Sequence, residues 1–283
     1  MPELAPPKFI PSGSRFITNL PNYRIDTFLA DNSTKLVVTF EPMGRIKSDG
    51  PNREGWGLAF LQEQGYSVMA VMFKECDWYR KPDLAAFFAQ MYKRGFFHGF
   101  DEVATYGGSM GGYGALAYAG AVKASTVLAL NPQVTLSPLW APWETRFAFA
   151  RKFDWQGEFA HAGSGIKNTR NVYVVYDPLT PLDAKQVHLL DQYHAGVVKL
   201  KIPVVGHHIP AWMAEMAVLK PTVLAILEGR FCASDFYHSV RKRRQLKRYW
   251  QMLISKPRVA KSRLFSLIVL RYAEHYGFPY END

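Results

Sequence analysis

A single serine stands among four glycines in residues 107–112, which read GGSMGG. Gly107, Ser109 and Gly111 form the pattern G-x-S-x-G, directly after the apolar run EVATY and directly before the helix-like segment GYGALAYAGA. Between a strand and a helix, this spacing is typical of a sharp turn in which only glycine avoids collisions with the neighbouring backbone. Because such a turn holds a hydroxyl beside the first N–H groups of a helix, Ser109 is the candidate nucleophile for acyl chemistry.

Two kinds of nucleotide site also use glycine-rich turns. A phosphate-binding loop needs a lysine after the glycines, where this chain has Tyr113. A dinucleotide fingerprint would begin at Gly112, too far beyond the strand, and needs an acidic residue farther on. No Asp or Glu occurs between Glu102 and Glu144. The sequence therefore argues against nucleotide binding, and no cofactor is expected.

A serine nucleophile needs a base to take its proton and an acid to orient that base. Asp177 directly follows the strand-like run NVYVVY and is the favoured acid. Asp183 is the alternative, although its position suggests the N-cap of the next helix. For the base, His207 and His208 follow the run KIPVVG, and His207 is favoured because it directly follows the glycine.

These candidates all require a sheet whose strands end at one edge. Apolar runs at 35–40, 66–73, 102–107, 125–131, 171–177 and 196–205 predict strands. Segments of helical periodicity at 55–65, 83–95, 111–122, 182–194 and 210–229 lie between or after them. The alternation predicts an α/β fold, with a mostly parallel sheet covered by helices on both faces.

One connection, residues 132–170, is too long for a simple turn and contains no convincing strand. It is rich in aromatic residues, including Trp140 and Trp143. Two interpretations stay open: the segment is a lid that binds substrate, or its rings seal the edge of the sheet.

The glycine-flanked serine, with a downstream aspartate and histidine in that order, resembles the α/β-hydrolase-fold serine hydrolases. The likeness covers about residues 30–230. It implies that the N–H of Met110 is one oxyanion-hole donor and that Glu41 or Phe40 supplies the second. Pro42, in the same loop, has no N–H to donate.

A substrate site at the carboxyl edge of this fold would include Phe40, Trp78 and Tyr79, together with Trp140 and Trp143 of the long connection. For the segment 74–84, which holds Trp78 and Tyr79, an ordinary polar loop with an aromatic plug is the favoured alternative. The resemblance implies a carboxylesterase-like enzyme that cleaves ester or thioester bonds through an acyl-enzyme. An acyltransferase with the same triad, or a non-catalytic binding protein on this scaffold, remains open.

Composition limits the expected disulfides, metal sites and membrane segments. The chain has 283 residues and two cysteines, Cys76 and Cys232, which suggest neither a disulfide framework nor a metal site. No signal peptide or membrane-spanning run is evident, so a cytoplasmic protein is expected. The sequence does not indicate an oligomeric state.

Charge concentrates at the C-terminus. The chain carries a net charge of +10, and residues 235–283 hold eleven Lys and Arg against four Asp and Glu, a net of +7. The predicted organisation is a catalytic domain at 1–230 and a basic helical extension at 231–283, with Pro257 between two helices. The extension either packs on the main domain or docks on an anionic surface; nucleic acid is a poor candidate because no recognition motif accompanies the charge.

Overall fold

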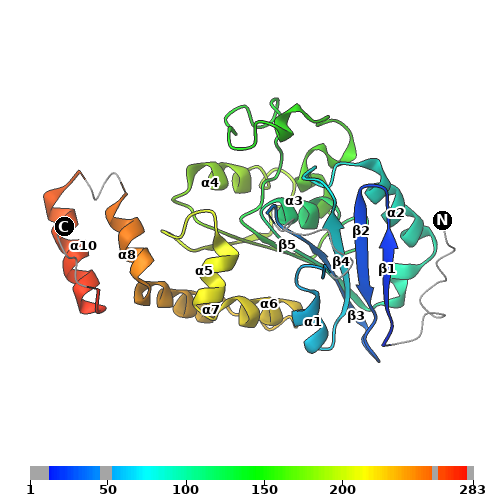
Figure 1. The fold of residues 1–283 in the computed structure, drawn as a ribbon, viewed down its shortest axis with the longest axis horizontal. Helices are drawn as coiled ribbons and strands as arrows, with labels where there is room; N and C mark the ends of the chain where they lie inside the picture. The colour runs from blue at the N-terminus through cyan, green and yellow to red at the C-terminus, as the bar shows by residue number, and fades with distance from the viewer. Residues whose placement is uncertain (1–12, 45–52, 257–260, 279–283) are drawn as a thin grey trace. The chain divides into compact units, whose positions relative to one another are not determined.

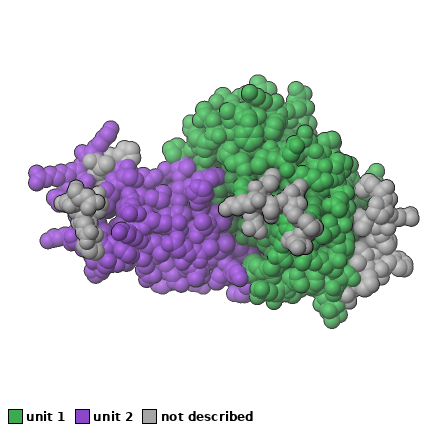
Figure 2. All heavy atoms as spheres, in the orientation of Figure 1, with its two compact units in different colours: residues 1–176, 181–200 green, residues 177–180, 201–283 purple. Residues whose placement is uncertain are grey.

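The computed structural model describes residues 13–44, 53–256 and 261–278. Their contacts divide the chain into two compact units, coloured in Figure 2. Unit 1 comprises residues 1–176 and 181–200, and unit 2 comprises residues 177–180 and 201–283.

An eight-stranded sheet has the strand order β1-β2-β4-β3-β5-β6-β7-β8 (Figure 1). The strands are β1 (Arg15–Asn19), β2 (Tyr23–Phe28), β3 (Lys35–Phe40), β4 (Ser67–Phe73), β5 (Glu102–Gly108), β6 (Thr126–Leu130), β7 (Asn171–Tyr176) and β8 (Val197–Lys201). From β4 through β3, β5 and β6 to β7 the pairing is parallel, whereas β1 and β2 pair antiparallel at one edge. The predicted mostly parallel α/β sheet is confirmed.

The parallel strands form where the sequence has unbroken apolar runs. All seven residues of β4 are buried, as are five of the six in β3. Helices α1 (Leu58–Glu63), α2 (Pro82–Lys93), α3 (Met110–Ala117) and α4 (Pro181–His188) lie around the sheet in unit 1. Burial on both faces explains the lack of polar alternation in these strands.

The first two strands were not predicted. β1 alternates between exposed and half-buried residues, and β2 carries Arg24 and Asp26, so neither reads as an apolar run. Asp26 is nevertheless fully buried, and its carboxylate accepts two hydrogen bonds from the guanidinium of Arg15. Pairing of β1 with β2 creates this ion pair, which explains how the charge is accommodated within the sheet.

The long connection 132–170 contains no strand, as predicted; its regular structure is three short 3-10 helices, η3 (Ala150–Lys152), η4 (Glu158–Ala160) and η5 (Ala162–Ile166). Some of its rings pack into the core of unit 1: Phe159 stacks on Tyr118 with ring centroids 4.5 Å apart, and Phe147 lies 4.9 Å from Trp78. Other apolar side chains of the segment remain exposed, among them Leu139 at 91% and Trp140 at 47%. The connection therefore seals the core with one set of side chains and presents another to solvent.

Unit 2 is helical. It contains α5 (Ile209–Glu215), α6 (Leu219–Leu227), α7 (Ala233–Ser239), η6 (Val240–Gln245), α8 (Lys247–Ile254) and α10 (Arg263–His275). The single helix predicted at 210–229 is in fact α5 and α6, because Ala217 adopts a left-handed φ of 56° and breaks the helix. Helices are found on both sides of the position of Pro257, which itself lies outside the described residues.

Among the described residues, no single helix has the length and apolar character needed to cross a membrane. One bent pair, α5 with α6 at 106°, passes the same test of length and composition.

Candidate functional site

Ser109 lies in the turn between β5 and α3, with φ 53° and ψ −118°. A positive φ is rare for a residue with a side chain and strains the backbone. The turn is held in place because the Ser109 N–H donates to the carbonyl of Leu130 on β6 at 2.8 Å, and its carbonyl accepts from the N–H of Tyr113 at 3.1 Å. Helix and neighbouring strand thus fix the conformation of the serine.

Both glycines of the G-x-S-x-G pattern are required by close backbone contacts. A Cβ on Gly107 would lie 2.1 Å from the carbonyl oxygen of Gly111, and a Cβ on Gly111 would lie 2.1 Å from the carbonyl oxygen of Phe40. Real Cβ atoms do not approach backbone so closely. The predicted collisions at these two positions, with the neighbouring helix and strand, are confirmed.

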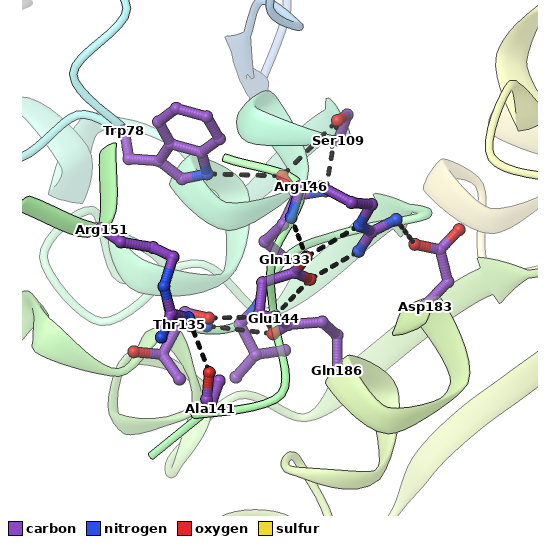
Figure 3. A network of polar contacts seen from close by, with 11 residues as sticks. Trp78, Ser109, Gln133, Thr135, Ala141, Glu144, Arg146, Arg151, Asp183 and Gln186 are labelled. Atoms are coloured by element: carbon purple, nitrogen blue, oxygen red, sulfur yellow. Dashed lines mark hydrogen bonds and ion pairs between the residues drawn. The ribbon is translucent and has the colours of Figure 1, made fainter. Parts of the chain in front are cut away.

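Gln133 was not among the predicted site residues, although it lies beside Ser109 (Figure 3). Its Nε2 is 3.4 Å from the serine Oγ and its Oε1 is 3.5 Å from the same atom. The indole N–H of Trp78, which can only donate, bonds to Oε1 at 3.3 Å. Trp78 therefore fixes the amide so that Nε2 is the donor available toward Ser109.

A signal for Gln133 was present in the sequence. The residue comes shortly after the strand β6, and the carboxyl ends of parallel strands meet at one edge of a sheet, where ligands bind. The structure adds that its polar side chain is fully buried, where a polar group requires hydrogen-bond partners.

Both predicted oxyanion-hole positions adjoin this turn. Met110 follows Ser109 in the chain, and Glu41 follows β3, the strand that pairs with β5. Met110 is the first residue of α3, so its N–H has no partner within the helix. The N–H of Glu41 donates to the carbonyl of Val71 at 3.5 Å, the long limit for such a bond. The side chain of Glu41 is buried, pairs with Arg53 and accepts from the N–H of Phe73 at 2.8 Å.

The aromatic residues Phe40, Trp78 and Tyr79 have no exposed side-chain surface. Tyr79 packs edge-on against Phe40 at 5.2 Å, and its hydroxyl donates to the carbonyl of Glu41 at 2.7 Å. Their rings thus form part of the core beneath the site, in agreement with the aromatic plug that was favoured for segment 74–84.

Asp77 anchors that segment. Its Oδ1 accepts from the N–H of Tyr79 at 2.8 Å, and its Oδ2 accepts from the hydroxyl of Tyr23. Burial raises the pKa of Asp77 to about 6, against the opposing effect of the Tyr23 hydrogen bond. Trp78 and Tyr79 both have positive φ values, 54° and 56°, so this anchor holds a strained stretch of backbone.

The two tryptophans predicted to contact substrate lie on the long connection. Trp140 is 47% exposed and meets the ring of His161 edge-on, with centroids 5.4 Å apart. Trp143 is half-buried and the ammonium group of Lys185 lies over its ring at 5.3 Å. Of the five predicted substrate-binding side chains, these two are the ones that reach solvent.

Asp183, the alternative acid, belongs to a buried ionic network that ties the long connection to α4 (Figure 3). The Arg146 guanidinium bonds to Asp183 at 2.5 Å and to both carboxylate oxygens of Glu144 at 2.9 and 2.7 Å. Burial acts to raise the pKa of Glu144, but the hydrogen bonds and charge of Arg146 outweigh it and lower that pKa. Asp183 is the third residue of α4, so its expected role as N-cap was wrong.

Unit 2 brings the favoured acid to the loop that carries the favoured base. Asp177 is fully buried; its Oδ2 accepts from the N–H groups of Val205 and Gly206 at 2.9 and 2.8 Å, and its Oδ1 accepts from Leu179 at 2.8 Å. Gly206 has φ 66°, as expected for a sharp turn before His207.

The two candidate bases differ in exposure. His207 is half-buried, whereas His208 is exposed and takes the N-cap position of α5. The convergence of Ser109 in unit 1 with His207 and Asp177 in unit 2 stays a prediction. Among the described residues, no group of three or more His, Cys, Asp and Glu side chains is arranged to hold a metal ion.

Comparison with known proteins gives structural likeness alone. No family model matches the chain, and no curated protein matches it. Among solved structures, the capsule O-acetyltransferase of Neisseria meningitidis serogroup A is 14% identical with a TM-score of 0.53, over 75% of this chain and 93% of that one. The esterase Est2 of Thermogutta terrifontis is 13% identical with a TM-score of 0.54, over 79% and 96%.

A sugar hydrolase from Lactococcus lactis is also similar, at 14% identity and a TM-score of 0.51, over 83% of this chain and the full length of that one. These matches span most of each protein, and this chain has the mostly parallel eight-stranded sheet described above. The chain therefore has the α/β-hydrolase fold.

Proposed function

We propose that this protein is a serine hydrolase that cleaves a carboxylic ester or thioester through Ser109, His207 and Asp177. The observation that carries the proposal is the backbone of Ser109. A strained φ of 53° is held by two glycines that tolerate no Cβ, at the junction of a parallel strand and a helix. Strain of this kind persists where it serves a function, and here it presents a hydroxyl at the N-terminus of α3.

In the proposed reaction, the Oγ of Ser109 attacks the acyl carbon while its proton passes to the imidazole of His207. The imidazolium then gives this proton to the leaving oxygen or sulfur, and the acyl group stays on Ser109. In the second half, water attacks the acyl-enzyme and loses a proton to the same imidazole, which returns it to the Oγ of Ser109 as the carboxylic acid leaves. Asp177 orients the imidazole, and its three backbone N–H donors in turn hold the carboxylate.

The negative charge that develops on the acyl oxygen needs N–H donors. We assign the N–H of Met110 as one donor and that of Glu41 as the second; each such donor contributes about 3 kcal/mol. The Glu41 amide is suited to this because its 3.5 Å bond to Val71 is weak.

Gln133 has a positioning role in this proposal. With its Oε1 held by Trp78, its Nε2 donates toward the Oγ of Ser109 at 3.4 Å. A donor there selects the serine rotamer by holding Oγ, while the O–H of Ser109 can itself donate to Oε1 of the same amide at 3.5 Å. In the proposed reaction this long bond is exchanged for one to the imidazole of His207, which takes the proton.

Substrate preference is proposed from the long connection 132–170. Its exposed Leu139, Trp140, Phe149 and Phe153 favour an apolar or ring-bearing acyl or leaving group. Similar folds are found in esterases and in an O-acetyltransferase. Transfer of the acyl group to an alcohol instead of water is therefore the second candidate, and it uses the same acyl-enzyme.

Labelling with a fluorophosphonate probe tests the proposal directly, because such probes react with an activated serine. Wild-type protein is expected to incorporate the probe stoichiometrically, and Ser109→Ala to incorporate none. Folded wild-type protein that does not react would favour a non-catalytic binding protein on this scaffold. Product analysis of an ester substrate with and without added alcohols then separates hydrolysis from acyl transfer.

A further inference from the structure

Helix α10 (Arg263–His275) exposes a row of large apolar side chains on one face. Leu264, Ile268 and Tyr272, which follow one another at helical spacing, are 65%, 43% and 59% exposed, and Leu267 beside them is 55% exposed. We call these four residues the apolar stripe. Together with Phe265, they make up five of the fifteen large apolar side chains exposed in the described part of the chain.

The opposite face of α10 is anchored within unit 2. Val269 and Ala273 are buried at 9% and 2% exposure, and α10 packs against α8. The ring of Trp250 on α8 lies 5.4 Å from that of Tyr276, just beyond the end of α10. The hydroxyl of Ser262 caps the start of the helix by accepting from the N–H of Phe265 at 3.4 Å. The helix thus has one face committed to packing and another that no described residue covers.

Cations accompany the apolar stripe. Lys261, Arg263 and Arg271 are exposed in or beside α10, against a single acidic residue of the helix, Glu274. Arg271 and His275 line a hollow of about 440 Å³ together with Ile268 and Tyr272. Apolar and basic groups therefore share one surface, within a C-terminal region of net charge +7.

We propose that the apolar stripe of α10 docks on an anionic lipid bilayer, with the helix lying in the plane of the headgroups. Helices that bind in this way place apolar side chains below the headgroups and Lys or Arg among the phosphates. Each cation near an anionic surface adds to the attraction, so the charge selects anionic over zwitterionic lipid.

A second copy of the chain fits this face less well. A helix of 13 residues is about 20 Å long and about 10 Å wide, so one face offers about 200 Å². A stable protein interface needs about 800 Å² on each partner. Pairing two copies would also bring Arg263 and Arg271 of each copy toward those of the other. Nucleic acid would use the cations but would leave the apolar side chains without a partner.

Cosedimentation of the full chain with lipid vesicles tests the proposal. Wild-type protein is expected to bind vesicles that contain about one third phosphatidylglycerol at least about tenfold more tightly than vesicles of phosphatidylcholine alone. Raising the salt concentration should weaken this preference because exposed charges are screened.

Three variants separate the contributions. Leu264→Ser/Ile268→Ser and Arg263→Gln/Arg271→Gln are each expected to reduce binding to anionic vesicles about tenfold or more. Ile17→Ser is the matched control, because Ile17 on β1 is 44% exposed, like Ile268 at 43%; it should bind as wild type does. All the replaced side chains are exposed, and circular dichroism verifies that each variant is folded.

Three results would overturn the proposal. The first is equal binding to both vesicle types. The second is vesicle binding that neither α10 variant alters. The third is the absence of vesicle binding in a protein that dimerises through α10, or that binds DNA or heparin regardless of Leu264→Ser/Ile268→Ser.

Discussion

The side-chain amide of Gln133 lies 3.4 Å from the hydroxyl oxygen of Ser109, and the indole of Trp78 holds that amide in one orientation. The relationship joins three segments that are far apart in the sequence. It places a buried hydrogen-bond donor beside the proposed nucleophile. Because Gln133 can be replaced while Ser109 is kept, the positioning of the serine can be tested separately from the serine itself.

Gln133→Ala is expected to lower kcat for an ester substrate about ten- to hundredfold with a much smaller change in KM, because the serine loses the donor that selects its rotamer. Trp78→Phe keeps a ring but removes the N–H, and should give a smaller loss in the same direction. Steady-state kinetics of both variants checks this. If Gln133→Ala raised KM alone, Gln133 would bind substrate rather than position the serine.

Gly107→Ala and Gly111→Ala should each destabilise the protein by about 3 kcal/mol or more, because the added Cβ would lie 2.1 Å from a backbone oxygen. Gly120→Ala is the matched control, since its Cβ would meet only the carbonyl of Gly165 at 3.2 Å. Urea unfolding measures the difference. Stability of Gly111→Ala equal to that of Gly120→Ala would show that the turn relaxes easily.

Asp177→Asn should reduce the rate of fluorophosphonate labelling by about 10⁴-fold, as loss of the orienting acid does in such triads. Asp183→Asn removes a charge partner of Arg146 and should lower stability by a few kcal/mol while labelling stays within about threefold of wild type. Labelling rates of the two folded variants decide whether Asp177 or Asp183 is the orienting acid. The reverse pattern would make Asp183 the orienting acid.

His161 predicts a pH dependence of stability. Burial lowers the pKa of His161 to about 4, below the 6.5 of an ordinary histidine. Between about pH 4 and about pH 6.5, the unfolded chain binds a proton at this histidine that the folded protein does not. The free energy of unfolding therefore falls as the pH drops through this range, by up to about 3 kcal/mol.

Replacement of His161 by Asn, which can still accept from the N–H of Gly163, should remove most of this loss. Urea unfolding between pH 7 and 4 measures it against His238→Asn, which removes an exposed histidine instead. Identical pH slopes for wild type and His161→Asn would contradict the assignment. Titration of Asp77, whose pKa is raised to about 6, changes the stability in the opposite direction as the pH falls. This change is the same in wild type and in His161→Asn, so it cancels when the two are compared.

Sequence reasoning predicted the parallel strands and the glycine turn well because both are local. The apolar run of β4 and the spacing of Gly107 and Gly111 around Ser109 are readable without distant contacts. It missed β1 and β2, since a buried Asp26 looks unsuited to a strand until Arg15 of the neighbouring strand pairs with it. It also missed Gln133: the position just after β6 is a signal in the sequence, but only the tertiary structure shows that the amide lies beside Ser109.

The sequence by itself determined the alternation of parallel strands and helices from β3 onward, the candidate nucleophile with its two glycines, and the concentration of positive charge after residue 235. These depend on residue type and spacing along the chain. Only the tertiary structure decided that Phe40, Trp78 and Tyr79 belong to the core, that Arg146 joins Glu144 to Asp183, and that α10 has an apolar face that none of the described residues covers. The physical reason is that burial and pairing depend on which distant segments meet, and no local pattern contains that information.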